Sequence, residues 1–328
     1  MNFFKKLSLT GDSKRIKQLK ELRQIFIVAI TVISLAFSIA IPLFILNKMG
    51  FIGSSMKHTY DKNIAIVHLN KEITLPYIND LMKTLDNIKK EVKDGSYTQV
   101  LIIASSPGGS PQGSDELANY LIEYQKEVPT TFYVQGVCAS GCYYIASSIQ
   151  HYPNNPLSGI IANPNSIVGS IGVVIPHLVY GPALNRLGVE NEYIYEGKYK
   201  VPIDSWELAS SESKAYIKSN ILSPVYKTFR EFVKQHRNIN ESSMSKLDEG
   251  RVFVATLVNN SLVDRISNLQ TIKTEIKEDL KKQFPNETIG FVEISTNQNK
   301  SLFVKTINDI NVLLKLFSSI DHKNLQMR

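Results

Sequence analysis

The chain has 328 residues, of which 43% are hydrophobic and 20% charged. This length and composition predict one large or two small folded domains, and they exclude an intrinsically disordered chain. The 37 Lys and Arg and 30 Asp and Glu residues give a net charge of +7. Residues 1–24 hold seven of the basic and two of the acidic residues, so the rest of the chain carries only +2. This distribution argues against a basic surface for nucleic acid.

An uncharged segment, IFIVAITVISLAFSIAIPLFIL, follows at residues 25–46. At ~1.5 Å per residue it is long enough to cross a hydrocarbon core of about 30 Å. Its length disfavours a cleaved signal peptide, and its apolar character on all faces disfavours a core helix. The positive-inside rule places residues 1–24 in the cytoplasm. We therefore expect a single-pass anchor in the inner or cytoplasmic membrane, a linker at 47–62, and a body on the periplasmic or extracellular side.

Beyond the linker, short apolar runs alternate with segments of helical spacing. The runs are expected to be strands and lie at 64–69, 99–104, 131–137 and 291–294. The helical segments lie at 76–92, 115–124 and 269–282. This alternation predicts a mainly parallel sheet with crossover helices.

Two longer segments also have helical character. Residues 205–238 are expected to form one long helix or a pair of helices broken near Pro224. Residues 301–320 have an amphipathic pattern. We expect this second helix to pack in an oligomer, cap the fold or touch the membrane.

The chain has two cysteines, Cys138 and Cys142, which form neither a disulfide framework nor a CxxC pair. The preferred interpretation is two small core residues. A disulfide or redox pair is the alternative, because an exported body lies in an oxidising space. The six histidines are scattered, and HExxH, Walker A and GxSxG motifs are missing from the sequence, so we expect no metal and no cofactor.

Three small-residue clusters could carry chemistry. The first, SPGG at 106–109, follows a predicted strand, and its glycines let backbone N–H groups approach a ligand. The second is GVCASGCYYIA at 136–146, where Ser140 stands between a predicted strand and a helix. There the hydroxyl would be exposed and the next N–H could bind an oxyanion, although a simple N-cap fits equally well. The third is the tight turn GSIGV at 169–173.

Together with EGKYKV at 196–201 and GRVFVATLVNNSLVDRI at 250–266, these clusters stand in the order of a known family. From about residue 62 to 268, the chain resembles the signal peptide peptidase A and SohB-like membrane-anchored serine proteases. The resemblance implies an α/β fold, a ClpP/crotonase-like spiral of β-β-α units, here with an N-terminal transmembrane helix. The protease domain is then expected at 63–285, followed at 286–328 by a strand and an amphipathic-helix extension.

The resemblance also implies roles for five residues. Ser140 would be the nucleophile, and Lys200, rather than Lys198, would be the general base. Ser170 would position the lysine amine, and the backbone N–H groups of Gly109 and Gly141 would form the oxyanion hole. A lysine amine can act as a base when apolar surroundings lower its pKa. The aromatic and apolar residues at 193–202 would supply such surroundings. Relatives form ring- or dome-shaped oligomers in which the lysine of one subunit completes the serine of its neighbour.

The sequence departs from the family pattern at four places. Cys142 stands where the family has a second glycine after the nucleophile, and Cys138 where it has a small residue, so side-chain bulk could narrow the oxyanion region. About eight residues are inserted near 151–160. Ser261 replaces a glycine in a structural turn.

The predicted protein is a serine endopeptidase with a Ser-Lys dyad, which cleaves signal peptides or other unfolded, membrane-released peptides outside the cytoplasm. It is expected to be a homo-oligomer with the dyad shared between subunits, and to have no nucleic-acid partner. The first alternative is a catalytically impaired membrane scaffold or peptide-binding member of the same fold. The second is acyl-CoA chemistry on this fold, which the location outside the cytoplasm disfavours.

Overall fold

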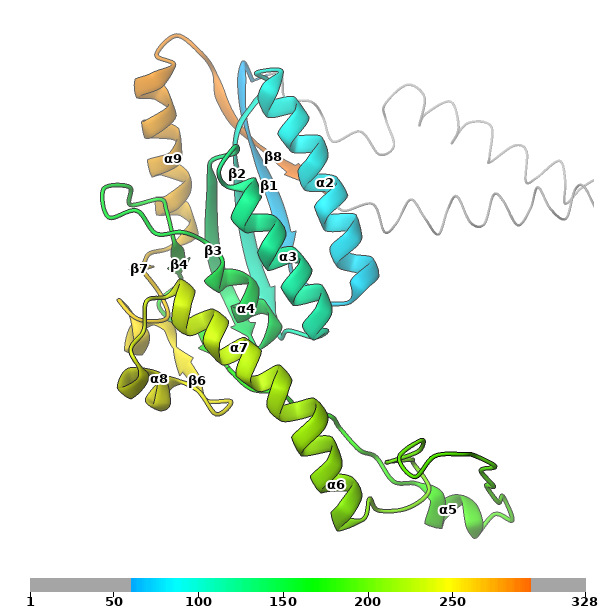
Figure 1. Ribbon diagram of the computed structural model, residues 1–328. Helices are drawn as coiled ribbons and strands as arrows, with labels where there is room; N and C mark the ends of the chain where they lie inside the picture. Colours follow the sequence, from blue (N-terminus) through cyan, green and yellow to red (C-terminus); the bar gives the residue numbers. More distant parts are fainter. Residues whose placement is uncertain (1–59, 296–328) are drawn as a thin grey trace, which may run out of the picture. The chain divides into compact units, whose positions relative to one another are not determined.

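The computed structural model describes residues 60–295 (Figure 1). The predicted cytoplasmic segment, membrane anchor and amphipathic helix, at 1–24, 25–46 and 301–320, lie outside these residues, as does most of the linker at 47–62. Within the described part, every helix is too short or too polar to span a bilayer.

A mixed sheet of eight strands forms the centre of the fold. Its main path runs in the order β6-β5-β3-β2-β1-β8. These strands are β1 (Lys62–Leu69), β2 (Tyr97–Ser106), β3 (Thr130–Ala139), β5 (Ile167–Gly169), β6 (Val252–Val254) and β8 (Ile289–Ile294). Off this path, β4 (Ile160–Ala162) pairs with β3, and β7 (Arg265–Ile266) pairs with β4. Only β5 and β6 pair in antiparallel fashion among the strands described, which confirms the predicted mainly parallel α/β sheet.

The apolar runs of the central strands are buried on both faces of the sheet. One face of β1 and β2, with Ala65, Val67 and Ile102, packs in the larger core cluster against α2, α3 and α4. The other face, with Ile64 and Leu101, packs in a second cluster with α9. A strand covered on both faces needs apolar residues at every position, which explains the continuous runs in the sequence.

The helices that cover the sheet are α2 (Leu75–Lys93), α3 (Pro111–Tyr124), α4 (Gly141–Ser147) and α9 (Leu269–Gln283). All but α4 begin at a side-chain cap. α3 begins four residues before its predicted start, because the Ser110 hydroxyl accepts a hydrogen bond from the Gly113 N–H at 3.2 Å. Pro111 suits the first helical position, where no N–H is needed.

The long helical segment is not broken at Pro224. α6 (Ser211–Ile217) continues through a π-helical turn (Lys218–Leu222) into α7 (Ser223–His236), so the single long helix is the alternative that the structure shows. The wider turn accommodates the missing N–H of Pro224, which stands in the first turn of α7. The helix also starts later than predicted, because the Ser210 side chain caps it through the Ser213 N–H.

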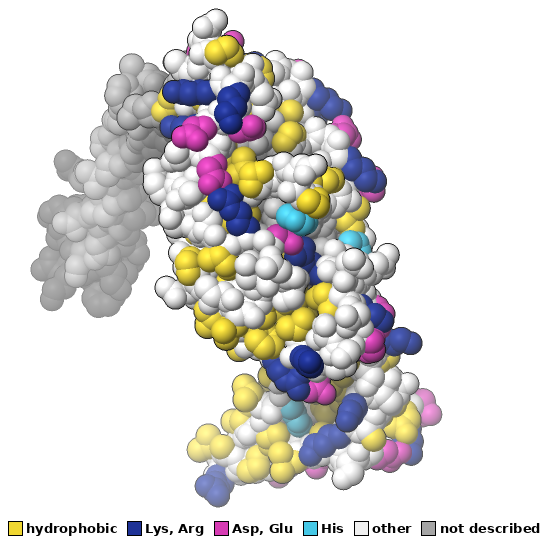
Figure 2. Space-filling model, turned by 90° about the vertical axis from the view of Figure 1, so that its left-hand side faces the viewer, with side chains coloured by type: hydrophobic (Ala, Val, Ile, Leu, Met, Phe, Trp, Pro, Cys, Tyr) yellow, Lys and Arg dark blue, Asp and Glu magenta, His cyan; other side chains and the backbone are white. Residues whose placement is uncertain are grey.

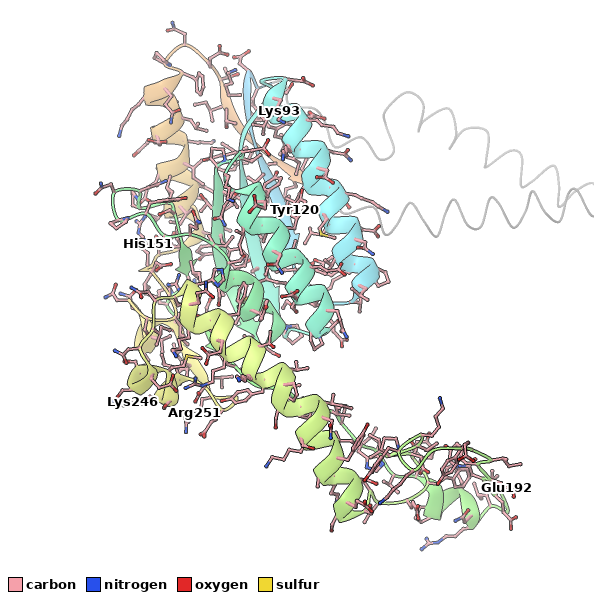
Figure 3. The ribbon with its side chains drawn as sticks, viewed as in Figure 1. Lys93, Tyr120, His151, Glu192, Lys246 and Arg251 are labelled. Atoms are coloured by element: carbon pink, nitrogen blue, oxygen red, sulfur yellow. A yellow bond between two sulfur atoms is a disulfide. The ribbon has the colours of Figure 1, made fainter. Side chains whose placement is uncertain are left out.

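Residues 177–217, here called the arm, carry the short helix α5 (Gly181–Asn185) as well as α6 and extend away from the sheet (Figure 1). Glu192 marks the far end of this segment (Figure 3). Large apolar side chains of the arm are exposed, among them Leu187 at 78% and Ile194 at 94%. Figure 2 shows hydrophobic side chains gathered on this lower part of the molecule.

An ion-pair network joins α7 to α8 (Glu241–Leu247). Because of this network, we expect the free energy of unfolding to depend on pH. Arg230 contacts Glu241 and lies 2.7 Å from Asp248, and Lys234 lies 2.9 Å from Glu241. Hydrogen bonds from Arg230 and then Lys234 lower the pKa of Glu241 from 4.5 to about 2. A depressed carboxyl pKa stabilises the fold above the unfolded value, and this contribution disappears as the pH falls from 4.5 to about 2.

We therefore expect the free energy of unfolding, measured by urea titration, to decrease across this acidic range. Glu241→Gln should flatten the decrease, whereas Glu278→Gln on α9 should not. Parallel pH curves for the parent and Glu241→Gln would contradict the assignment.

Candidate active site

Ser140 occupies a strained turn between β3 and α4. Its φ of 53° and ψ of −124° are rare for a residue with a side chain. The Ser140 N–H donates to the Gly169 carbonyl at 2.9 Å, and the Ser140 carbonyl accepts from the Tyr144 N–H at 3.0 Å. Its hydroxyl makes no capping hydrogen bond to α4, so the N-cap interpretation fails. A serine on a strained strand-to-helix turn is the arrangement that presents a nucleophile in α/β-hydrolases.

The backbone of the SPGG cluster lies directly against this turn. A Cβ atom on Gly108, whose φ is 101°, would lie 2.7 Å from both the Ala139 carbonyl oxygen and the Gly141 nitrogen. A Cβ atom on Gly141 would lie 3.4 Å from the Gly109 nitrogen and 2.2 Å from Ser114 Oγ. Only glycines allow these two stretches of backbone to approach so closely.

The N–H groups of Gly109 and Gly141 are available as donors. The bonds around Gly109 use its neighbours: the Ile73 N–H donates to the Gly108 carbonyl, and the Ser110 N–H donates to the Ile73 carbonyl, both at 2.8 Å. Among the hydrogen bonds of residues 60–295, none uses the N–H of Gly109 or Gly141. Two neighbouring unused backbone donors beside a serine hydroxyl can stabilise an oxyanion.

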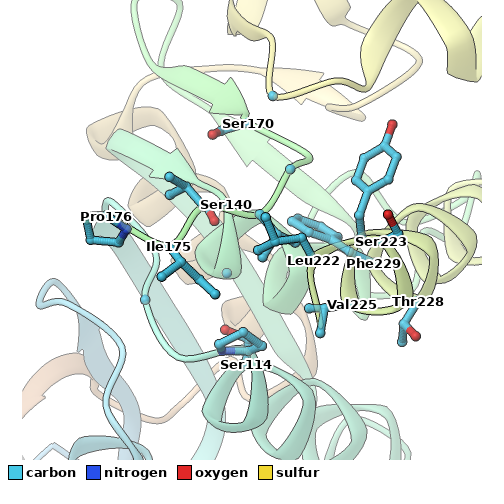
Figure 4. A pocket seen from close by; sticks show the side chains of 18 of the residues that line it. Ser114, Ser140, Ser170, Ile175, Pro176, Leu222, Ser223, Val225, Thr228 and Phe229 are labelled. Carbon is cyan, nitrogen blue, oxygen red and sulfur yellow. The ribbon is translucent and has the colours of Figure 1, made fainter. Parts of the chain in front are cut away.

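Ser170 is brought to the same place by the register of the sheet. Ala139, the last residue of β3, pairs with Gly169, the last residue of β5. The next residue of each strand is a serine with positive φ, 53° at Ser140 and 55° at Ser170. The Ser170 N–H donates to the Arg251 carbonyl at 2.6 Å, which fixes the second turn. Figure 4 shows the two serines on neighbouring turns.

A groove of about 1420 Å³ runs past these groups. Gly109, Ser140, Gly141 and Ser170 all line it. Much of the remaining wall is apolar and comes from the base of the arm and from the start of α7; it includes Ile175, Ile203, Ile217, Leu222, Val225 and Phe229. Figure 4 shows four of these, Ile175, Leu222, Val225 and Phe229. Leu222, Val225 and Phe229 were not predicted as site residues, although their spacing marks one face of a helix.

Tyr144 and Asp115 form a polar pair in the groove. The Tyr144 hydroxyl donates to Asp115 Oδ1 at 2.7 Å, and its ring stacks on Phe232 with centroids 4.1 Å apart. Burial, and then the hydrogen bond to Asp115, raise the pKa of Tyr144, so its phenol stays neutral. Within residues 60–295, no group of three His, Cys, Asp or Glu side chains could hold a metal ion.

Lys200 is not brought to Ser140 within the chain. It is exposed on the arm, its N–H donates to the Gly197 carbonyl at 3.0 Å, and it does not line the groove. Its expected apolar surroundings are also not found within one chain, since Tyr193 and Tyr195 are 48% and 54% exposed.

The neighbouring Lys198 pairs with Glu212 at 2.5 Å. This hydrogen bond raises the pKa of Lys198, which keeps its amine charged and unsuited to act as a base.

Cys138 and Cys142 form a disulfide, with their Cα atoms 5.1 Å apart. The preferred interpretation of two unbonded core residues is therefore wrong, although both side chains are fully buried. The error follows from the turn, because the strained backbone at Ser140 sets the Cα separation and the sequence spacing does not reveal it.

Residues 122–283 match the model of peptidase family S49. The chain is a relative of the family S49 peptidases. This match confirms the resemblance found in the motifs. The matched range includes Ser140, Gly141, Ser170 and Lys200.

Two relatives and one solved structure illustrate the likeness. A protein of Methanocaldococcus jannaschii named "Putative protease" is 28% identical over 74% of this chain and 72% of its own length. One of Enterococcus faecium named "Putative signal peptide peptidase SppA" is 28% identical over 63% of this chain, which spans 60% of that relative. A ClpP1 mutant from Listeria monocytogenes, at 15% identity, covers 63% of this chain and 94% of its own with a TM-score of 0.40. That score is too low to assign the ClpP/crotonase-like spiral, which stays a prediction.

Proposed function

We propose that the protein is a serine endopeptidase in which Ser140 is the nucleophile. The observation that carries the proposal is the strained Ser140 turn with two unused backbone donors, Gly109 and Gly141, beside it. Ser140 Oγ attacks the scissile carbonyl, and the resulting oxyanion accepts hydrogen bonds from the two N–H groups. The peptide C–N bond then breaks, the amine leaves, and water hydrolyses the acyl-enzyme.

The general base in this proposal is Lys200 of a second copy of the chain. A neutral lysine amine takes the hydroxyl proton of Ser140 and passes it to the leaving amine, while Ser170 holds the amine in place. Two features support a donor from another subunit: Lys200 lies outside the groove of its own chain, and the arm that carries it exposes large apolar side chains. Contact between subunits would bury these side chains and supply the apolar surroundings that favour a neutral lysine.

The groove suits an extended, apolar peptide. Its apolar wall on α7 and at the base of the arm offers pockets for hydrophobic side chains. The Gly108–Ser110 backbone already pairs with Ile73, so a substrate would lie as a strand along the groove side of the SPGG cluster. Signal peptides and other unfolded segments released at a membrane have this chemistry. The predicted anchor at 25–46 would hold the groove close to them, outside the cytoplasm.

A non-catalytic scaffold is the second candidate, because Lys200 does not line the groove of its own chain. Hydrolysis of casein and of a fluorogenic peptide library by the full chain in detergent separates the two functions. The enzyme cleaves some of these substrates, whereas a scaffold binds peptides and cleaves none in any assembled state.

Gly108→Ala tests the oxyanion hole. The new Cβ atom would lie 2.7 Å from the Gly141 nitrogen and would push the two donors apart. Loss of one such donor is expected to lower kcat about 10²-fold with little change in KM.

The matched control is Gly95→Ala. Gly95 also has a positive φ, 80°, and does not line the groove; an added Cβ atom would meet only Lys62 Nζ, at 3.9 Å, so kcat should stay within about threefold. An unchanged kcat in Gly108→Ala would exclude this oxyanion hole.

A further inference from the structure

The two cysteines lie on either side of the proposed nucleophile. Cys138 is the last but one residue of β3, Cys142 is the second residue of α4, and Ser140 alone lies between the two elements. The disulfide therefore closes a ring of five residues with Ser140 at its centre. The same ring contains the peptide N–H of Gly141. Any movement of the bridge is thus shared by the nucleophile and by one oxyanion donor.

The Ser140 turn needs to be held, because its backbone conformation is strained. Its own hydroxyl makes no capping bond, so two backbone hydrogen bonds, from Ser140 to Gly169 and from Tyr144 to Ser140, hold it directly. The disulfide adds a covalent link between the sheet and α4. At the sheet end, Cys138 is fixed by pairing with both Ser106 and Val168.

The disulfide also explains why the sequence departs from the family pattern at both Cys138 and Cys142. Cys142 replaces a glycine of the family pattern and Cys138 a small residue, and the structure joins these two departures in one bond. Both sulfurs are fully buried beneath the turn and do not line the groove. Side-chain bulk at residue 142 is therefore directed into the core and leaves the oxyanion region open.

We propose that the Cys138–Cys142 disulfide is a positioning element of the active site, which holds Ser140 and the Gly141 N–H in their reactive arrangement. This inference rests on the proposed function of Ser140. It predicts that loss of the bridge lowers the reactivity of Ser140 more than it lowers substrate binding or assembly.

The test compares the full chain in detergent with Cys138→Ala/Cys142→Ala and Cys138→Ser/Cys142→Ser. Thiol titration of the unfolded parent checks that the bridge is present. The measurements are the labelling rate of Ser140 by a fluorophosphonate probe, kcat and KM on a peptide, oligomer size and melting temperature. Ile276→Val, in the cluster around α9, is the control for lost stability, because it removes a buried methylene far from the turn.

Both double variants should label at least tenfold more slowly and lose kcat in proportion, with KM within about threefold and the oligomer intact. Ile276→Val should label at the parent rate. Labelling of either double variant at the parent rate, or free thiols in the parent, would overturn the inference and leave the proposed function standing. If the parent labels no faster than Ser140→Ala, the proposed function fails and this inference fails with it.

Discussion

Replacing Ser140 with alanine is expected to lower kcat on a peptide substrate by at least about 10⁴-fold. The variant keeps the groove and the N–H groups of Gly109 and Gly141, but it has no oxygen to attack the scissile carbonyl. Only oxyanion stabilisation and binding remain, so a small residual activity over water is expected while KM changes little. The measurement is steady-state hydrolysis of a fluorogenic peptide by the purified, assembled chain.

Ser147→Ala is the matched control for this substitution. Ser147 lies on the same short helix, but its hydroxyl is buried and donates to the Tyr143 carbonyl at 2.7 Å. Ser147→Ala removes a hydroxyl from α4 that does not line the groove, so kcat should stay within about threefold. Hydrolysis by Ser140→Ala at more than a hundredth of the parent rate would rule out Ser140 as the nucleophile.

Mixing two inactive variants is expected to restore activity. Ser140→Ala lacks the nucleophile and Lys200→Ala lacks the base, so each assembly alone should be nearly inactive. In an equal, random mixture, a site shared between neighbours is complete when an intact serine meets an intact lysine, which occurs at roughly a quarter of the sites. Peptide hydrolysis after co-expression, with separate tags to show mixed assembly, measures this fraction.

The result distinguishes a shared dyad from one within a single chain. If each chain used its own lysine, every subunit in the mixture would lack one member of the dyad and no activity would return. Lys198→Ala is the matched control. Because Lys198 is paired with Glu212 and stays charged, we expect this variant to keep most of its kcat.

The central part of the fold could be predicted because burial there imposes a simple pattern. β1 and β2 are covered on both faces, and their continuous apolar runs follow directly from that. Helix ends were harder to predict. α3 begins at Ser110, where side-chain capping decides the start, and the π-helical turn before Pro224 depends on how the backbone adjusts over several residues.

The site could be predicted only in part, for a similar reason. Ser140 and Ser170 stand at the ends of paired strands, so sheet register alone brings them together. Lys200 lies on the arm, which extends away from the sheet, so strand register does not bring it beside Ser140 within the chain (Figure 1). The disulfide was only the alternative interpretation, because a spacing of four residues allows a bridge only where the local backbone brings the two residues together, as the strained turn does here.

The arm has a consequence for how the rate depends on protein concentration. If the base is supplied by a neighbour, an isolated subunit has a groove and a nucleophile but no means of activating it. Specific activity would then rise with concentration until assembly is complete, and dilution would switch the enzyme off without any inhibitor. A newly made subunit, still alone, would be harmless to nearby proteins until it met its partners.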